Sequence, residues 1–381
     1  MPILANTVSQ ESQLVDQAVS WLAERLPKGW SATRSERMVE GNVGSELRVL
    51  DAAIDVKASN ATWATLAVEA RRSFSPRDAQ LLFSGVAGPL RALAGHIPVL
   101  VVAPWLSERT QQLLAAEGIN FLDLTGNALI RLENPALYLR SAGATRNPVP
   151  APRGPARVRG SKAARVVRLL ADARPPYGVQ EISAATGLTR GYVSRLIDAL
   201  DQEALIEREP RGPVRSVEVA ALLRRWGQSY DVFTSNRAAM FLAPQGGGFA
   251  LDRLARLREE VGRVAVTGSF AAIRHAPVAA PALLALYCED VERIAAELEL
   301  LPADVGANVV LLRPFDAVAW TRTERADGIA YAAVSQVAVD CLTGNGRMPA
   351  EGDALLDWMT ANEERWRART LDDFALPDDS R

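Results

Sequence analysis

The sequence has very few of the residues that build metal sites and disulfides. Its 381 residues include two cysteines, Cys288 and Cys341, and two histidines, His96 and His275. Two distant cysteines in apolar surroundings indicate buried thiols rather than a disulfide. No cluster of cysteine and histidine has the spacing of a zinc site. We therefore expect neither a metal nor a cofactor.

Long apolar runs are also absent. No stretch approaches the roughly 20 apolar residues that span a membrane. Glu11 and Asp16 interrupt the N-terminal region where a signal peptide would carry its apolar segment. With 48% hydrophobic and 23% charged residues, the composition is that of a folded protein of two or three domains. These features predict a cytoplasmic protein without a membrane partner.

The most informative pattern lies at residues 179–201, VQEISAATGLTRGYVSRLIDALD. Ile182 and Val193 have the spacing of two helix faces that pack on each other. Gly187 lies between them, where a turn with positive φ favours glycine, and Thr189 is a good N-cap for the second helix. This arrangement is typical of a helix-turn-helix, whose second helix enters the major groove of DNA.

The flanking segments extend the motif to a winged helix. Residues 162–173 have helical apolar spacing, and we expect Arg165 and Arg168 on the outer face of that helix. Residues 205–209 and 214–219 read as two short strands around a glycine turn, the pattern of a wing. The alternative is a small helical domain used for packing or dimerisation. The residues predicted to contact DNA are Thr189, Arg190, Tyr192, Ser194 and Arg195 on the second helix and Arg208, Arg211 and Arg215 on the wing.

Charge is distributed unevenly along the chain. The chain has a net charge of −2, yet residues 153–228 contain fourteen basic and eight acidic residues, a local charge of +6. Between Glu133 and Asp172 there is no acidic residue. Part of this segment is a proline-rich, soluble linker. Its arginines can also contact the phosphates of DNA, and the two interpretations are compatible. The eight basic residues of the segment are Arg140, Arg146, Arg153, Arg157, Arg159, Lys162, Arg165 and Arg168.

Residues 1–146 are predicted to form a mixed α/β domain. The pattern indicates a helix at 13–26, a β-hairpin at 50–56 and 63–70, and then helices alternating with strands. The expected helices cover 76–93 and 106–117, and the expected strands cover 97–103, 119–124, 128–132 and 137–140.

Acidic residues at the hairpin suggest a nuclease-like site. Asp51 starts the first strand and Glu69 closes the second, as in the PD-(D/E)xK pattern, where two carboxylates bind Mg²⁺. The domain therefore resembles the restriction-endonuclease-like fold. Arg71 occupies the position of the lysine, and arginine cannot readily replace lysine at a site that activates water. We expect a degenerate, inactive site at Asp51, Glu69 and Arg71; the alternative is a salt-linked strand edge.

The third region, residues 229–381, is again α/β. A strand at 263–267 ends in Gly268-Ser269 at the start of a helix, as in nucleotidyltransferases that bind a triphosphate on helix N–H groups. Such a turn also starts helices in many unrelated proteins. Glu289 and Asp290 follow the next strand, but adjacent residues of a strand point to opposite faces. They therefore do not supply the paired carboxylates of that chemistry.

Three segments together carry a family resemblance: KAARVVRLLADARPPYGVQEISAATGLTRGYVSRLIDALDQEALIERE, AVTGSFAAIRHAP and SQVAVDCLTGNGRMPAEGDALLDWM. The chain resembles actinobacterial helix-turn-helix proteins grouped with the AbiEi-type antitoxins of type IV toxin–antitoxin systems. The resemblance implies a DNA-binding repressor, acting on its own operon and opposing a nucleotidyltransferase-type toxin. The winged helix is central in this chain, whereas AbiEi-type antitoxins usually carry it at the N-terminus.

The sequence thus predicts a multidomain α/β (α+β) protein. Its expected parts are a restriction-endonuclease-like domain at 1–146, a linker at 147–160, a winged helix-turn-helix at 161–228 and a nucleotidyltransferase-like α/β domain at 229–381. The predicted function is a sequence-specific, DNA-binding transcriptional regulator that acts as a homodimer on double-stranded DNA, with a cognate toxin as a second partner. The alternative is a Mg²⁺-dependent nuclease guided by the winged helix.

Overall fold

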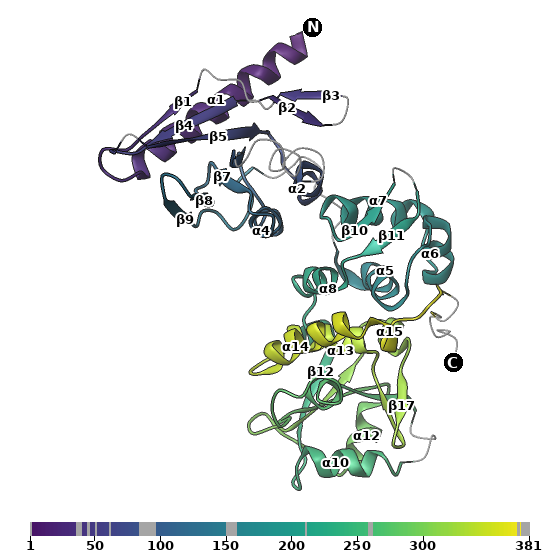
Figure 1. Cartoon of the computed structure of the whole chain (residues 1–381). Coiled ribbons are helices and arrows are strands. Elements are labelled where there is room, and N and C mark those ends of the chain that lie inside the picture. Colours follow the sequence, from purple (N-terminus) through teal and green to yellow (C-terminus); the bar gives the residue numbers. More distant parts are fainter. Residues whose placement is uncertain are drawn as a thin grey trace. The chain divides into compact units, whose positions relative to one another are not determined.

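Figure 1 shows the computed structural model of the chain. The structure describes residues 2–35, 40–43, 46–49, 52–60, 62–83, 97–149, 158–209, 212–257, 262–371 and 374. The chain divides into two compact units, and the main change from one to the other falls between Gly154 and Pro155. This division lies within the linker predicted at 147–160. Each unit is described by itself.

The first unit is built on a seven-stranded sheet with the order β1-β4-β5-β6-β7-β8-β9. The pairs β5–β6 and β6–β7 are parallel, and the other pairs are antiparallel. A separate two-stranded sheet joins β2 (Glu40–Val43) to β3 (Glu46–Val49). The strands of the large sheet are β1 Ser31–Arg34, β4 Ala52–Lys57, β5 Trp63–Ala70, β6 Val99–Ala103, β7 Asn120–Asp123, β8 Ala128–Leu132 and β9 Leu137–Ser141.

Helices cover both faces of this sheet because its central strand is apolar on both sides. Side chains alternate between the faces of a strand. Val99 and Val101 of β6 share a core with α2 (Pro76–Leu82) and α4 (Glu108–Ala116). Leu100 and Val102 share the opposite core with α1 (Pro2–Arg25). Residues 84–93 of the helix predicted at 76–93 lie outside the described residues, and strand β1 was not predicted.

The second unit begins with the predicted winged helix. Its three helices and two wing strands follow in the expected order, and a further helix, α8, was not predicted. Tyr177 forms an additional bridge to Val214 of the wing. The elements are α5 Gly160–Asp172, α6 Val179–Thr186, α7 Arg190–Gln202, β10 Ile206–Arg208, β11 Val214–Val217 and α8 Val219–Gly227.

The rest of this unit is a second seven-stranded sheet, with the order β15-β12-β16-β14-β13-β18-β17. The strand predicted at 263–267 corresponds to β13, and the strand expected before Glu289 corresponds to β14. The strands are β12 Arg237–Leu242, β13 Val264–Thr267, β14 Leu284–Cys288, β15 Leu301–Pro302, β16 Val309–Arg313, β17 Glu324–Ala326 and β18 Ile329–Tyr331. The helices are α9 Val232–Ser235, α10 Gly247–Leu254, α11 Ser269–Ala272, α12 Val291–Glu297, the short 3₁₀ helix η3 Ala317–Trp320, α13 Val334–Leu342, α14 Met348–Ala361 and α15 Glu363–Trp366.

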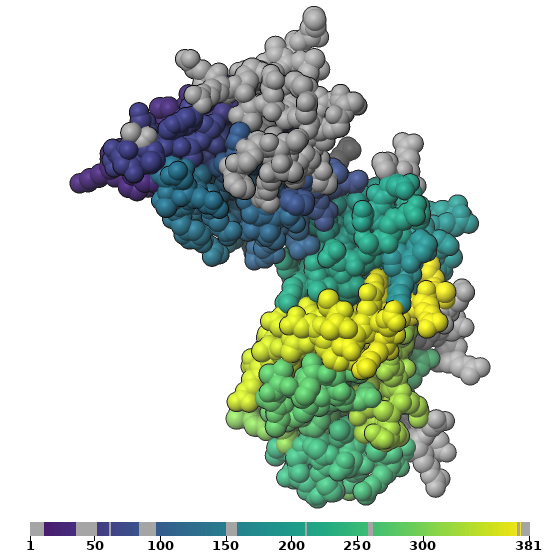
Figure 2. All heavy atoms as spheres, viewed as in Figure 1, coloured from purple at the N-terminus to yellow at the C-terminus, as the bar shows by residue number. Residues whose placement is uncertain are grey.

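The winged helix and this sheet share one hydrophobic core. The helix α13 contacts α5 and α8 of the winged helix on one side and α11 and β13 on the other. In Figure 2 the yellow band of C-terminal residues lies between the teal winged helix and the green residues of the sheet. The regions predicted as separate domains at 161–228 and 229–381 therefore pack as one body.

Both cysteines are free and buried, as the sequence predicted. Burial raises the pKa of Cys288 to about 12, so its thiol stays protonated at neutral pH. Within the described part of the chain, no helix combines the length and the apolar character needed to cross a membrane. No group of three or more metal-binding side chains lies together among these residues.

Candidate nucleic-acid interface

The corner between α6 and α7 has the geometry of a helix-turn-helix. Gly187 ends α6 with φ of 65°, in the left-handed region that glycine adopts at little cost. The hydroxyl of Ser183 donates to the carbonyl oxygen of Leu188 at 2.5 Å, which ties α6 to the turn. Ile182 and Val193 are fully buried, so the two helices pack through the residues that the sequence assigned to their inner faces.

The outer face of α7 presents two free cations. Arg190 and Arg195 are exposed, and neither has an ion-pair partner among the residues that the structure describes. Thr189 is exposed and precedes α7, and its carbonyl oxygen accepts the backbone N–H of Val193 at 3.1 Å. Thr189 therefore occupies the N-cap position that the sequence predicted, at the end of α7 that enters the groove in this class of motif.

Tyr192 and Ser194 are half-buried on the same helix. The ring of Tyr192 packs against the core of the winged helix. Partial burial raises the pKa of Tyr192. Both side chains thus lie beside the two arginines but have less freedom to move.

The two wing arginines that the structure describes, Arg208 and Arg215, differ in their ion pairs and in their exposure to solvent. The guanidinium of Arg208 pairs with Asp198 and, at 3.5 Å, with Asp201, and its side chain is only 10% exposed. Arg208 therefore binds β10 to α7 instead of extending into solvent. Arg215 is 56% exposed and pairs with Glu209 at 3.1 Å, a surface contact that solvent and salt weaken. Arg211 lies outside the described residues.

The basic segment before the winged helix is only partly available to DNA. Arg140, Arg146, Arg159 and Lys162 are exposed, and Arg153 and Arg157 lie outside the described residues. Arg165 makes a two-pronged pair with Asp316 of the C-terminal sheet region, with nitrogen–oxygen distances of 3.0 Å from Nε to Oδ1 and from Nη2 to Oδ2. Only part of the segment can therefore reach phosphates.

The prediction that Arg168 lies on an outer face is wrong. The Arg168 side chain is completely buried and pairs with Asp172, one turn along α5, at 2.8 Å. It also donates to Gln336 at 2.8 Å and to the carbonyl oxygens of Val318 and Thr321. The periodicity of α5 identified one apolar face, but the C-terminal region covers the opposite face as well.

Cations from the C-terminal region also stabilise the last turn of α5. Arg367 donates to the carbonyl oxygen of Leu170 at 2.8 Å, and Arg322 donates to that of Asp172 at 2.6 Å. The last carbonyl groups of a helix carry partial negative charge and favour cations. Local spacing could not indicate these contacts, since their partners lie about 150 to 200 positions apart.

The network continues to Asp340, near the C-terminal end of α13. This fully buried carboxylate accepts hydrogen bonds from Thr267, Tyr230, Tyr287 and Gln336, at 2.6–2.8 Å. Burial raises the pKa of Asp340, and the four donors partly oppose that effect. Gln336 contacts both Arg168 and Asp340, so a continuous polar network joins the winged helix to the sheet.

The nuclease-like positions of the first unit form no described metal site. Glu69 is buried, and the Nε of Arg71 donates to its Oε1 at 2.6 Å, an ion pair between residues on one face of a strand end. Asp51 lies outside the described residues. Glu69 and Arg71 are thus salt-linked, but Glu69 is buried on an inner strand, whereas the alternative prediction placed it on an exposed strand edge.

The hydroxyl group at the Gly268–Ser269 turn is hydrogen-bonded to another side chain of the protein. Gly268 has φ of 62°, and the hydroxyl of Ser269 donates to the buried carboxylate of Glu351 at 2.5 Å. Asp290 caps α12 by accepting the backbone N–H of Arg293, and Glu289 pairs with Arg263 at 3.6 Å. Glu289 and Asp290 therefore stabilise the protein locally, through an ion pair and a helix cap.

Comparison with known families matches one part of the chain. Residues 161–210 match the IclR helix-turn-helix domain. No curated protein and no solved structure matches the chain at a significant level. The matched range covers α5, α6, α7 and the first wing strand, the same elements whose geometry is described above. The chain therefore carries an IclR-type helix-turn-helix DNA-binding domain, which supports a DNA-binding transcriptional regulator.

Proposed function

We propose that the protein is a transcriptional regulator that recognises a specific DNA sequence through α7. The observation that carries this proposal is the pair Arg190 and Arg195, exposed and without ion-pair partners among the described residues, on the second helix of a helix-turn-helix. Arginine in this position reads guanine or binds phosphate. Thr189, Tyr192 and Ser194 complete the reading surface.

The wing and the basic segment supply contacts to the backbone in this proposal. Arg215, on β11, reaches phosphates once its surface pair with Glu209 opens, and Arg211 is proposed to do the same. Arg208 acts differently, because its pairs with Asp198 and Asp201 hold the wing on α7. The local charge of +6 over residues 153–228 favours duplex DNA and makes binding weaken as salt rises.

Selection of duplexes from a random library tests sequence recognition. We expect the full chain to enrich one motif, and Arg190→Ala or Arg195→Ala to relax the preference at one position of it. Arg293→Ala is the matched control, since Arg293 is an exposed arginine on α12, away from the winged helix. Failure of the wild-type chain to enrich any motif would contradict sequence-specific recognition.

We propose that the regulator binds as a homodimer. One winged helix covers a short footprint, and paired half-sites lie about one helical turn apart, roughly 34–36 Å. Light scattering of the free protein and of its complex with the selected duplex measures the number of chains. A single chain in both samples would contradict this part of the proposal.

The resemblance to AbiEi-type antitoxins suggests a narrower role, repression of an operon that also encodes a toxin. Its support is the sequence resemblance, which covers most of residues 50–370. Binding to the chain's own promoter, together with co-purification of the product of the neighbouring gene, would support this role. Binding to unrelated promoters alone would contradict it.

The nuclease alternative has less support. The engagement of Glu69 by Arg71 and the presence of arginine in place of lysine both argue against an activated water. Incubation of the chain with plasmid and Mg²⁺ or Mn²⁺, beside an Asp51→Ala/Glu69→Ala control, decides the question. Cleavage by the wild type that disappears in the control would establish the nuclease.

A further inference from the structure

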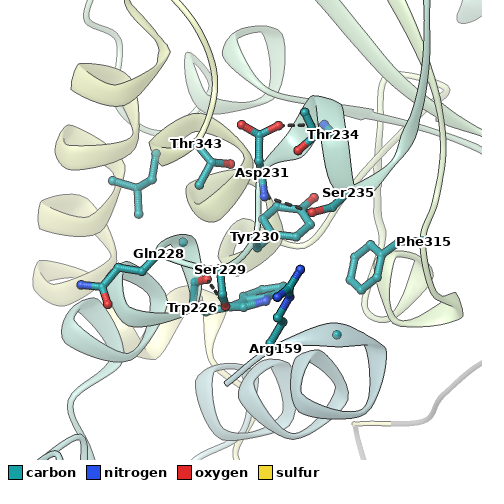
Figure 3. Close-up of a pocket in the computed structure, with 13 residues that line it drawn as sticks. Arg159, Trp226, Gln228, Ser229, Tyr230, Asp231, Thr234, Ser235, Phe315 and Thr343 are labelled. Carbon is teal, nitrogen blue, oxygen red and sulfur yellow. Dashed lines mark hydrogen bonds between the residues drawn. The ribbon is translucent and has the colours of Figure 1, made fainter. Parts of the chain in front are cut away.

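The side chains around one pocket of the second unit do not define a class of ligand. This pocket lies between the start of α5 and the end of α8 (Figure 3). Trp226 and Tyr230 are 1% and 5% exposed, so their rings belong to the core. Asp231 caps α9, and Arg159 is exposed to solvent. Backbone groups of fixed direction are available instead at an edge of the first sheet.

Among the described residues, the two seven-stranded sheets end in the edge strands β1, β9, β15 and β17. An edge strand exposes N–H and C=O groups that can pair with another chain, and natural edges are often short or interrupted by proline. The strand β15 has two residues, one of which is Pro302, β17 has three and β1 has four. The strand β9, an outer strand of the first unit in Figure 1, has five residues and an unbroken register with β8. It is the longest of the four edges.

Alternate residues of β9 direct their backbone groups away from the sheet. The backbone N–H of Arg131, on β8, donates to Oδ1 of Asn120 at 2.7 Å, and Asn120 belongs to β7 on the other side. Tyr138 lies directly opposite Arg131 and therefore forms no ladder bond with it, because ladder bonds alternate along an antiparallel pair. The N–H and C=O groups of Tyr138, and of Arg140 two residues along, thus point outward.

The side chains of β9 form two distinct faces. Leu137 and Leu139 are half-buried and pack against the core that the sheet shares with α1. Tyr138 and Arg140 share the opposite face. Tyr138 is 64% exposed, Arg140 is exposed, and neither has an ion pair or a ring contact among the described residues. An aromatic ring and a guanidinium of the same strand are therefore both available to a partner.

Antiparallel pairing of β9 with a second copy of itself uses all of these groups. With a two-fold axis at Leu139, this residue lies opposite Leu139 of the second copy, and Tyr138 lies opposite Arg140 of the second copy. Four N–H···O bonds then join the outward-pointing groups, and each tyrosine ring meets a guanidinium in a favourable cation–π pair. The strand is thus complementary to itself, as a closed two-fold dimer requires, whereas an axis at Arg140 would oppose like charges.

We propose that β9 joins two copies of the chain into a dimer whose sheet continues across the two-fold axis. This inference rests on the homodimer of the proposed function and names its interface. Leu139 of the two copies then cover each other. Five residues from each copy bury little area, so the free dimer should be weak, with a dissociation constant of about 1–100 µM.

Disulfide trapping in the full chain tests the pairing directly. The Cα atoms of opposed residues in a non-hydrogen-bonded pair lie about 4.5 Å apart, within the range for a disulfide. Oxidised Leu139→Cys should therefore run mainly as a covalent dimer on a denaturing gel. Leu137→Cys and Ser141→Cys should each stay unlinked alone and give a linked pair when mixed, because positions 137 and 141 are opposed. The wild type is the background control, since both native cysteines are buried.

Charge reversal supplies an independent test by sedimentation equilibrium. Tyr138→Lys places a like charge opposite Arg140 at two symmetric points, so we expect it to weaken the dimer about tenfold. Tyr138→Lys/Arg140→Glu places opposite charges there and should recover dimerisation. Thr234→Lys adds the same charge at an exposed site of the second unit and should leave the dissociation constant unchanged.

The outcomes separate this interface from the proposed function. No link in Leu139→Cys, or equal linking of Leu137→Cys and Leu139→Cys, would overturn the interface, and so would equal dimerisation of the wild type, Tyr138→Lys and the double variant. If light scattering counts two chains on the selected duplex while Leu139→Cys stays unlinked, the homodimer stands and only this interface falls. A single chain in every sample would contradict both proposals.

Discussion

The guanidinium of Arg168 donates to the side-chain oxygen of Gln336 at 2.8 Å, and both side chains are completely buried. Arg168 belongs to the first helix of the winged helix, and Gln336 belongs to the central helix of the C-terminal region. The DNA-binding domain is therefore joined to its neighbour through a polar core as well as through apolar packing.

Loss of Arg168 should strongly destabilise this unit. Arg168→Met leaves the carboxylate of Asp172, only 2% exposed, without its charged partner. Removal of one member of a buried ion pair costs about 3–5 kcal/mol, which urea unfolding followed by circular dichroism measures. Arg215→Met is the control, since an exposed pair contributes about 0–1 kcal/mol. Equal stability of Arg168→Met and the wild type would contradict the role of the network.

Asp340 should make stability depend on pH. Its folded-state pKa is raised by burial, so the folded state binds the proton more tightly than the unfolded state does. The resulting contribution to stability is fully present below the unfolded pKa and is lost as pH rises through the folded pKa. Asp340→Asn cannot titrate and lacks this component. We expect the melting temperature of the wild type to fall relative to Asp340→Asn as pH rises above 4, whereas a constant difference from pH 4 to 8 would contradict the shift.

Gly187 should tolerate substitution only at a cost in backbone strain. An added Cβ meets no atom within 4 Å, so the positive φ of 65° is the only obstacle. Gly187→Ala should destabilise the chain by about 1–2 kcal/mol, and Gly187→Asn by less, because asparagine adopts this conformation more readily. Gly248→Ala also meets no atom within 4 Å but has no positive φ, so thermal unfolding should show no loss there. Identical melting of Gly187→Ala and wild type would exclude the strain.

The two wing arginines should respond differently to mutation. Arg208→Ala releases Asp198 and the nearly buried Asp201, so we expect a loss of about 1–3 kcal/mol in the free energy of unfolding. Arg215→Ala should leave stability within about 0.5 kcal/mol but lower DNA affinity and reduce the slope of affinity against salt by about 1. Unfolding and fluorescence anisotropy on both variants measure these effects. A reversed order of the two stabilities would contradict the assigned roles.

The sequence predicted the local part of the interface well. The corner between α6 and α7 depends on residues within about ten positions of each other. The apolar spacing of Ile182 and Val193 predicts that they are buried, and the glycine at Gly187 predicts a positive φ. The main strands of both sheets were likewise predictable, because runs such as 97–103 are apolar and bounded by turn residues.

The long-range part could not be predicted. Nothing in the spacing of residues 162–173 distinguishes an arginine that faces solvent from one that faces a second domain. Arg168 contacts Gln336, 168 positions away, only after the chain has folded. Strand β12 has an apolar run of five residues, AAMFL at 238–242, but alanine and methionine favour helices over strands, so the run did not predict a strand.

The affinity of an Arg190→Ala/Arg195→Ala double variant for the selected duplex tests the central claim most directly. If both side chains contact DNA, each loss costs about 1–3 kcal/mol, so we predict an affinity lower by at least one order of magnitude, with the melting temperature of the free protein unchanged. An affinity equal to that of the wild type at the same salt concentration would contradict the account.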